Sequence, residues 1–163
     1  MSEIKGTTWD FRGNQIGPKS ALALCYVSGW RGKDRLITAA SVMTAESQRY
    51  VRAWHLNHEH DLEGNNVYRN DTGEPIFFSA DHGLFQINRP ELEPFDDELF
   101  NPKTNAKLAF ALFEQRHFQP WAAYNSGAYL KFVPEFEKKY SIERGNFVGT
   151  WRLLIPKWEA YAG

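Results

Sequence analysis

The clearest hydrophobic pattern along the chain lies between Asp34 and Ser47. Apolar residues recur there at the three- and four-residue spacing of one helix face, at Leu36, Ala39, Ala40, Val42 and Met43. Asp34 precedes this pattern and is a suitable N-cap, so a helix is predicted from that position. Glu46 ends the apolar stripe, close to the direction of Ala39, and folding is therefore expected to remove its carboxylate from water.

Glu46 is for this reason a candidate general acid. Burial disfavours the charged form of a carboxyl group, so its pKa should rise. A carboxyl group that stays protonated near neutral pH can donate a proton to a leaving group. The alternative is that the helix ends by Ser47 and that Glu46 is solvated there, although a negative charge at a helix C-terminus opposes the helix dipole.

The remaining pattern is mainly helical. Residues 1–17 are polar and rich in Gly and Asn, which is typical of an N-terminal arm or loop, and residues 49–64 show no clear period. Further helices are predicted at 18–28, from Pro102 to about His117, and at 120–124, 134–140 and 150–161.

One region has the composition of a small sheet. Val67–Arg69 and Ile76–Phe78 flank Asn70–Gly73, whose residues favour a hairpin turn. Residues 79–83 predict a second turn, and Leu84–Ile87 a third strand. The 163 residues are thus expected to form one α+β domain, mainly helical, with a small three-stranded antiparallel sheet.

Composition and charge narrow the function classes. The formal net charge is −1 and no basic run or stripe appears, which argues against nucleic acid as the main partner. No run of 18 apolar residues occurs, so insertion into a membrane is not expected, and the first residues lack the pattern of a secretion signal. The single cysteine, Cys25, is expected to be buried and has no partner for a disulfide within the chain.

A cluster of metal-ligand residue types occurs at His55, His58 and His60, beside Glu59 and Asp61. Two histidines three apart could share a helix face, whereas the spacing of His58 and His60 suits an extended chain. Because this mixture matches no zinc template, a solvated loop is the expected structure. We therefore expect no metal ion and no cofactor.

Three segments carry a resemblance to a known family. They are Ala45-Glu46-Ser47 at the end of a predicted helix, Asp81-His82-Gly83-Leu84-Phe85-Gln86-Ile87-Asn88 in the predicted sheet, and Trp121-Ala122-Ala123-Tyr124-Asn125-Ser126-Gly127-Ala128-Tyr129. Together, over roughly residues 36–129, they resemble the lysozyme superfamily. The resemblance is closest to the phage lysozyme-like domains and the lytic transglycosylase domains of the SLT type.

The resemblance implies a lysozyme-like fold in which the sheet flanks a sugar-binding cleft. It implies cleavage of the β-1,4 bond between N-acetylmuramic acid and N-acetylglucosamine, with Glu46 as the general acid. Gln86 and Asn88 would lie within reach of the substrate on the strand side. Tyr124 and Asn125 would lie across the cleft and also bind substrate.

Asp81 is the best candidate for the second group that this chemistry needs. Glycoside hydrolysis uses a second carboxylate to stabilise an oxocarbenium-like transition state or to activate water. Asp81 precedes Gly83 at the predicted turn, where backbone N–H groups and water could keep it ionised. The alternative is that Asp81 only forms an Asx-turn through its side chain. Its presence favours hydrolysis over transglycosylation.

The expected function is therefore a muramidase acting on the glycan strands of peptidoglycan, as a phage endolysin or a tail-associated lysin. Such a protein would stay in the host cytoplasm until released to the cell wall, or would belong to the virion, where phage tail proteins are further expected partners. One alternative is a lytic transglycosylase that forms 1,6-anhydro products. Another is a non-catalytic wall-binding or virion structural module.

Overall fold

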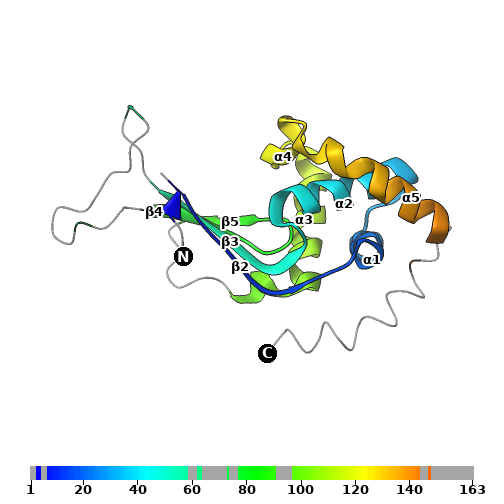
Figure 1. Ribbon diagram of the computed structural model, residues 1–163, viewed down its shortest axis with the longest axis horizontal. Helices are drawn as coiled ribbons and strands as arrows, with labels where there is room; N and C mark the ends of the chain where they lie inside the picture. Colours follow the sequence, from blue (N-terminus) through cyan, green and yellow to red (C-terminus); the bar gives the residue numbers. More distant parts are fainter. Residues whose placement is uncertain are drawn as a thin grey trace.

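The computed structural model describes residues 3–4, 7–58, 62–63, 73, 77–90, 97–143 and 147. These residues form an α+β structure, mainly helical, with one antiparallel sheet. Figure 1 shows the sheet on one side and the helices gathered on the other. The helix α2, which carries Glu46, lies within the helical part, and its last residues face the sheet.

The sheet contains five strands within the described residues, in the order in which they occur along the chain. They are β1 (Glu3–Ile4), β2 (Thr7–Gln15), β3 (Tyr50–His58), β4 (Phe77–His82) and β5 (Ile87–Pro90). Every neighbouring pair is antiparallel. The prediction of a small antiparallel sheet is confirmed, but the number of three strands is wrong.

Among the first 17 residues, the described residues 3–4 and 7–15 form strands and not the arm or loop that the composition predicted. Thr7–Gln15 forms β2 and pairs with β3 from Thr7 opposite Asn57 to Gln15 opposite Tyr50, with an irregularity between Arg12 and Gln15. A long antiparallel partner supplies backbone hydrogen bonds to a segment whose own composition is a weak strand signal. The predicted strand Val67–Arg69 lies outside the described residues.

The segment after β4 also differs from the prediction. Residues 79–82 belong to β4 rather than to the predicted turn. The turn is formed by residues 83–86, so residues 84–86 are not part of a strand as predicted, and the next strand begins at Ile87. Gly83 and Gln86 both have left-handed backbone conformations there, with φ of 71° and 50°. The buried side chain of Asn105 holds this turn, because it accepts from the N–H of Phe85 and donates to the carbonyl oxygen of His82.

The predicted helices are largely confirmed. The observed helices are α1 (Pro18–Ser28), α2 (Lys33–Ser47), α3 (Pro102–Arg116), α4 (Ala122–Asn125) and α5 (Val133–Glu143), with the 3-10 helices η1 (Asp97–Phe100) and η2 (Ala128–Phe132). The predicted N-cap of α2 is wrong, because Gly32 occupies that position with φ of 90° and Asp34 lies in the first turn. The predicted helix at 150–161 lies outside the described residues.

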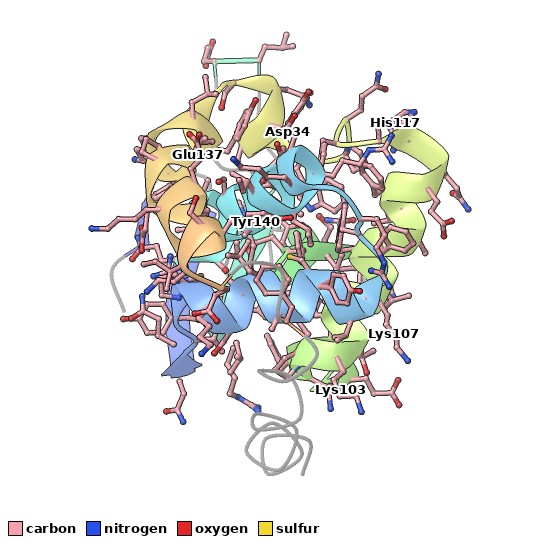
Figure 2. The ribbon with its side chains drawn as sticks, turned by 90° about the vertical axis from the view of Figure 1, so that its right-hand side faces the viewer. Asp34, Lys103, Lys107, His117, Glu137 and Tyr140 are labelled. Carbon is pink, nitrogen blue, oxygen red and sulfur yellow. The ribbon has the colours of Figure 1, made fainter. Side chains whose placement is uncertain are left out.

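The core forms around α2. The predicted apolar face of this helix is buried, with Ala39, Ala40, Val42 and Met43 fully inaccessible to solvent. Cys25 of α1 is also fully buried, as predicted, and burial raises the pKa of its thiol. Figure 2 shows α1, α3 and α5 arranged around this centre. No helix among the described residues is long and apolar enough to cross a membrane.

Candidate active site

A cavity of about 420 Å³ lies where the sheet meets the helices. Its walls come from the end of α2, from β4 and β5 with the turn between them, and from the residues around the C-terminus of α3 and the start of α4. The polar side chains that line it include Glu46, Asp81, Gln86, Asn88, Arg89 and Arg116. Two carboxyl groups predicted from separate segments thus meet in one cavity.

Glu46 lies in the last turn of α2 and is partly buried. Its Oε1 accepts a hydrogen bond of 3.1 Å from the backbone N–H of Ala123 at the start of α4. Burial raises the pKa of Glu46; the hydrogen bond from Ala123 opposes this rise, the charge of Asp81 adds to it, and the charge of His55 opposes it. The net pKa is raised, so a solvated glutamate does not describe this side chain.

The backbone after Glu46 turns sharply and is held by Arg49. Gln48 and Arg49 both adopt left-handed conformations, with φ of 54° and 66°. The guanidinium of Arg49 donates to the carbonyl oxygen of Ile16 at 3.0 Å and to the hydroxyl of Thr44 at 3.1 Å. These bonds join the end of α2 to the segment that follows β2, and they fix the direction in which α2 delivers Glu46 to the cavity.

Asp81 lies near the end of β4, between β3 and β5, and is surrounded by hydrogen-bond donors. Its direct neighbours across the sheet are His55 on β3 and Asn88 on β5. His55 Nδ1 lies 3.1 Å from Oδ2, Asn57 Nδ2 donates to the same oxygen at 3.1 Å, and Asn88 Nδ2 donates to Oδ1 at 2.8 Å. Because these bonds run to neighbouring strands, an Asx-turn does not describe Asp81.

The donors around Asp81 determine its charge. Burial alone raises the pKa of this carboxyl, but the hydrogen bonds from His55, Asn88 and Asn57, together with the charge of His55, hold the pKa below its ordinary value. Asp81 is therefore ionised over a wider pH range than a free aspartate. The cavity thus combines a carboxyl that tends to keep its proton with one that tends to lose it.

Gln86 and Asn88, the two predicted substrate-binding residues of the sheet side, both line the cavity. Gln86 is buried, and its Nε2 braces the turn by donating to the carbonyl oxygens of Gly83 at 2.9 Å and Ala53 at 3.1 Å. Its Oε1 is buried and accepts no hydrogen bond within the described residues. Asn88 is exposed and holds Asp81, so its side chain is tied to the carboxylate.

Tyr124 and Asn125, predicted across the cleft, lie in α4 but not among the residues that line the cavity. The ring of Tyr124 stacks between those of Phe118 and Tyr129, with centroids 5.2 Å and 5.1 Å away. Asn125 donates to the carbonyl oxygen of Gln119 at 2.8 Å. Their contacts stabilise the segment that supplies the N–H of Ala123 to Glu46.

Sequence reasoning did not identify His55, Asn57, Arg89 and Arg116 as site residues. His55 and Asn57 are two apart on β3, and this period-two spacing would have placed them on one face had residues 50–58 been read as a strand. His55 and His58 lie on β3 rather than in the predicted solvated loop, and Glu59, His60 and Asp61 lie outside the described residues. Within the part of the chain that is described, no three His, Cys, Asp or Glu residues form a group suited to a metal ion.

Comparisons with protein-family models, with curated proteins and with solved structures gave no match to this chain. Two carboxyl groups with opposite pKa shifts in one cavity are suited to acid catalysis by one group and charge stabilisation by the other. Hydrolysis of a glycosidic bond commonly uses both roles.

Proposed function

We propose that this protein is a peptidoglycan-degrading glycoside hydrolase, a muramidase that cleaves the β-1,4 bond between N-acetylmuramic acid and N-acetylglucosamine. The observation that carries the proposal is the presence of Glu46 and Asp81 in one cavity, with the pKa of Glu46 raised and that of Asp81 lowered. This is the assignment of acid and anion that glycoside hydrolysis needs.

In the proposed reaction Glu46 donates its proton to the oxygen of the glycosidic bond. The bond between that oxygen and the anomeric carbon breaks, and the departing sugar leaves with a new hydroxyl group. Positive charge that develops on the remaining sugar ring is stabilised by the Asp81 carboxylate. Water then adds to the anomeric carbon, and its proton restores the acid form of Glu46.

The position of the three family-like segments supports this proposal. Ala45-Glu46-Ser47 ends α2, residues 81–88 form the end of β4, the turn and the start of β5, and Trp121–Tyr129 contains α4. The three segments meet around one cavity, as a lysozyme-like fold requires. The proposed setting, a phage endolysin or tail-associated lysin that acts on the bacterial wall, follows from the same resemblance.

The test is mass spectrometry of the fragments that the protein releases from purified peptidoglycan. Fragments with a reducing muramic acid end are expected for a hydrolase. Fragments lighter by one water, with an anhydro ring, would instead show a lytic transglycosylase that does not need Asp81. If no fragments are released from any wall type, the protein would instead be a non-catalytic wall-binding or virion structural module.

Two variants make this test specific to the proposed acid. Glu46→Gln keeps the shape of the side chain but has no proton to donate, so fragment release should fall by about 10²- to 10⁴-fold. Glu114→Gln removes an exposed glutamate of α3 that does not line the cavity, and it should release fragments at the parental rate.

A further inference from the structure

The cavity carries two positive charges that the proposed reaction does not use. Arg89 lines it from β5, and Arg116 lines it from the last turn of α3. The side chain of Arg116 is exposed, and within the described part of the chain it forms no ion pair. Its guanidinium therefore keeps its hydrogen-bond donors for a group that enters the cavity.

The carboxyl groups of the cavity form no ion pair with Arg116 within the described residues. The oxygens of Asp81 receive donors from His55, Asn57 and Asn88, and Glu46 receives the N–H of Ala123. The donors to both carboxyl groups are thus residues other than Arg116. A cation that lines the cavity and forms no ion pair attracts an anionic ligand.

The chemistry of a guanidinium indicates which anion. Its planar fork of donors matches a carboxylate and binds it through two parallel hydrogen bonds. A neutral glycan made only of N-acetylglucosamine offers hydroxyl and acetamido groups, which need no cation. The glycan of peptidoglycan carries carboxylates, either on the lactyl ether of N-acetylmuramic acid or on the peptide attached to it.

We propose that Arg116, assisted by the charge of Arg89, forms a subsite for a carboxylate carried by the glycan, and that this subsite makes the cavity selective for acidic over neutral glycans. The inference rests on the proposed function for the identity of the glycan. It goes beyond that function by naming the residues that distinguish one amino-sugar polymer from another.

A structural role offers a competing explanation for Arg116. A cation in the last turn of a helix is stabilised by the helix dipole, whether or not a ligand is present. Arg116→Lys separates the two explanations, because lysine keeps the positive charge at the end of α3 but loses the bidentate fork. A dipole role predicts that this variant behaves as the parent in binding, whereas a carboxylate subsite predicts weaker binding.

The experiment measures binding by calorimetry in the full chain with Glu46→Gln, so that the ligands are not cleaved. Three ligands of equal length are compared: an N-acetylglucosamine tetrasaccharide, a tetrasaccharide of alternating N-acetylglucosamine and N-acetylmuramic acid, and the latter with its peptides attached. Adding Arg116→Gln should weaken binding of a carboxylate-bearing ligand by about tenfold, the loss of one charge-assisted contact, and leave the neutral ligand unchanged.

The two carboxylate sources give different results. If Arg116→Gln weakens binding of the peptide-free acidic ligand only, Arg116 binds the lactyl carboxylate. If it weakens binding of the peptide-bearing ligand only, Arg116 binds a carboxylate of the peptide. Lys107→Gln is the matched control, since it removes one positive charge from the same helix about 14 Å along its axis from Arg116. Figure 2 shows Lys107 well away from His117, the residue that follows Arg116.

The proposed subsite is contradicted if Arg116→Gln weakens binding of the neutral and acidic ligands equally or weakens binding of neither. It is also contradicted if the effect of Arg116→Gln on binding is no larger than that of Lys107→Gln. Absence of binding by all three ligands overturns it as well. The proposed function is judged separately, by turnover of peptidoglycan in the chain with Glu46 intact. Turnover of peptidoglycan without selectivity for acidic ligands would rule out only the proposed subsite. Selective binding of acidic ligands without turnover would rule out only the proposed enzymatic activity.

Discussion

The Nδ1 atom of His55 lies 3.1 Å from the Oδ2 atom of Asp81, and the two residues are direct neighbours across the β3–β4 pair. The charge of the same histidine also acts on Glu46 and lowers the pKa of that carboxyl. One imidazole thus influences both groups of the proposed reaction. Its removal should therefore affect both sides of the pH dependence.

His55→Ala is expected to move the whole pH profile of kcat/KM to higher pH. Removing the imidazole takes away a hydrogen bond and a charge that lower the pKa of Asp81, so this pKa rises. Because Asp81 is the anion of the proposed reaction, the acidic limb should move to higher pH. The pKa of Glu46, the proposed acid, also rises, so the alkaline limb should move in the same direction. The measurement is the rate of peptidoglycan cleavage across the pH range.

Asn57→Ala is the control for this prediction. Asn57 donates to Asp81 without carrying a charge, so its removal should move the acidic limb and leave the alkaline limb in place. If His55→Ala lowered the rate at every pH without moving either limb, His55 would be a packing residue. A downward shift of the acidic limb would contradict the electrostatic argument altogether.

Glu46→Gln is expected to stabilise the protein at neutral pH while it lowers turnover. Burial raises the pKa of Glu46 in the folded state, so the folded protein holds a proton that the unfolded chain releases at lower pH. Stability is therefore lost as pH rises from the ordinary glutamate pKa through the folded value. Glutamine remains neutral and avoids this loss.

Urea unfolding of the parent and of Glu46→Gln checks this relation. The difference in the free energy of unfolding should be small at pH 3.5, about one unit below the ordinary pKa of glutamate, and should favour the variant at pH 8. A difference that does not change with pH would mean that Glu46 titrates alike in the folded and unfolded states.

The candidate acid could be predicted because its signal is local. Glu46 ends an apolar stripe on a single helix, and the helix alone places its carboxyl against the core. Asp81 was predicted through the resemblance of residues 81–88, although the backbone conformation predicted for it was wrong. The expected turn is strand β4, and the donors that keep Asp81 ionised come from β3 and β5.

The neighbours of these two residues could not be predicted in the same way. His55 reaches Asp81 only because β3 pairs with β4, and β3 is itself held by β2, which looked like an arm. Pairing between strands depends on long-range register rather than on local composition. Arg116 ends a helix that was predicted correctly, yet nothing in its own segment indicates which cavity that helix end would line.

Asn105 is expected to be essential for folding of the turn that follows β4. It is fully buried, accepts from Phe85 N at 2.9 Å, and donates to the carbonyl oxygens of His82 and Leu99 at 2.8 Å each. Asn105→Asp keeps the shape and the acceptor but loses both donations, which leaves two buried carbonyl groups facing a carboxylate. The free energy of unfolding in urea should fall by about 3 kcal/mol or more.

A smaller loss from Asn105→Asp would indicate that the turn tolerates unpaired carbonyl groups. Asn101→Ala provides a comparison on the same helix, since Asn101 caps α3 through bonds to the N–H groups of Lys103 and Thr104. Loss of such a cap costs about 1 kcal/mol. The free energy of unfolding should therefore fall about three times as much for Asn105→Asp as for Asn101→Ala.

Gly83→Ala is expected to disrupt the same turn from the other side. A Cβ atom at Gly83 would lie 2.5 Å from Asn105 Nδ2 and 2.5 Å from the backbone oxygen of Leu99, at a φ of 71°. Because both the backbone conformation and the space are unsuitable, a loss of about 3 kcal/mol or more is expected in thermal or urea unfolding. Gly127→Ala is the matched control, with φ of 81° and its nearest contact at 3.5 Å, and should cost only about 1–2 kcal/mol.

Gln48→Gly should stabilise the protein without changing the cavity. Gln48 is exposed and ends α2 in a left-handed conformation with φ of 54°, which a residue with a Cβ adopts at a cost of about 1–2 kcal/mol. Its backbone oxygen accepts from Gln15, a bond that glycine keeps. After the greater entropy loss of glycine is subtracted, a gain of about 0.5–1 kcal/mol is expected in urea unfolding, with unchanged turnover. Reduced turnover in a stabilised variant would show instead that the strained turn after Glu46 is needed to position the acid.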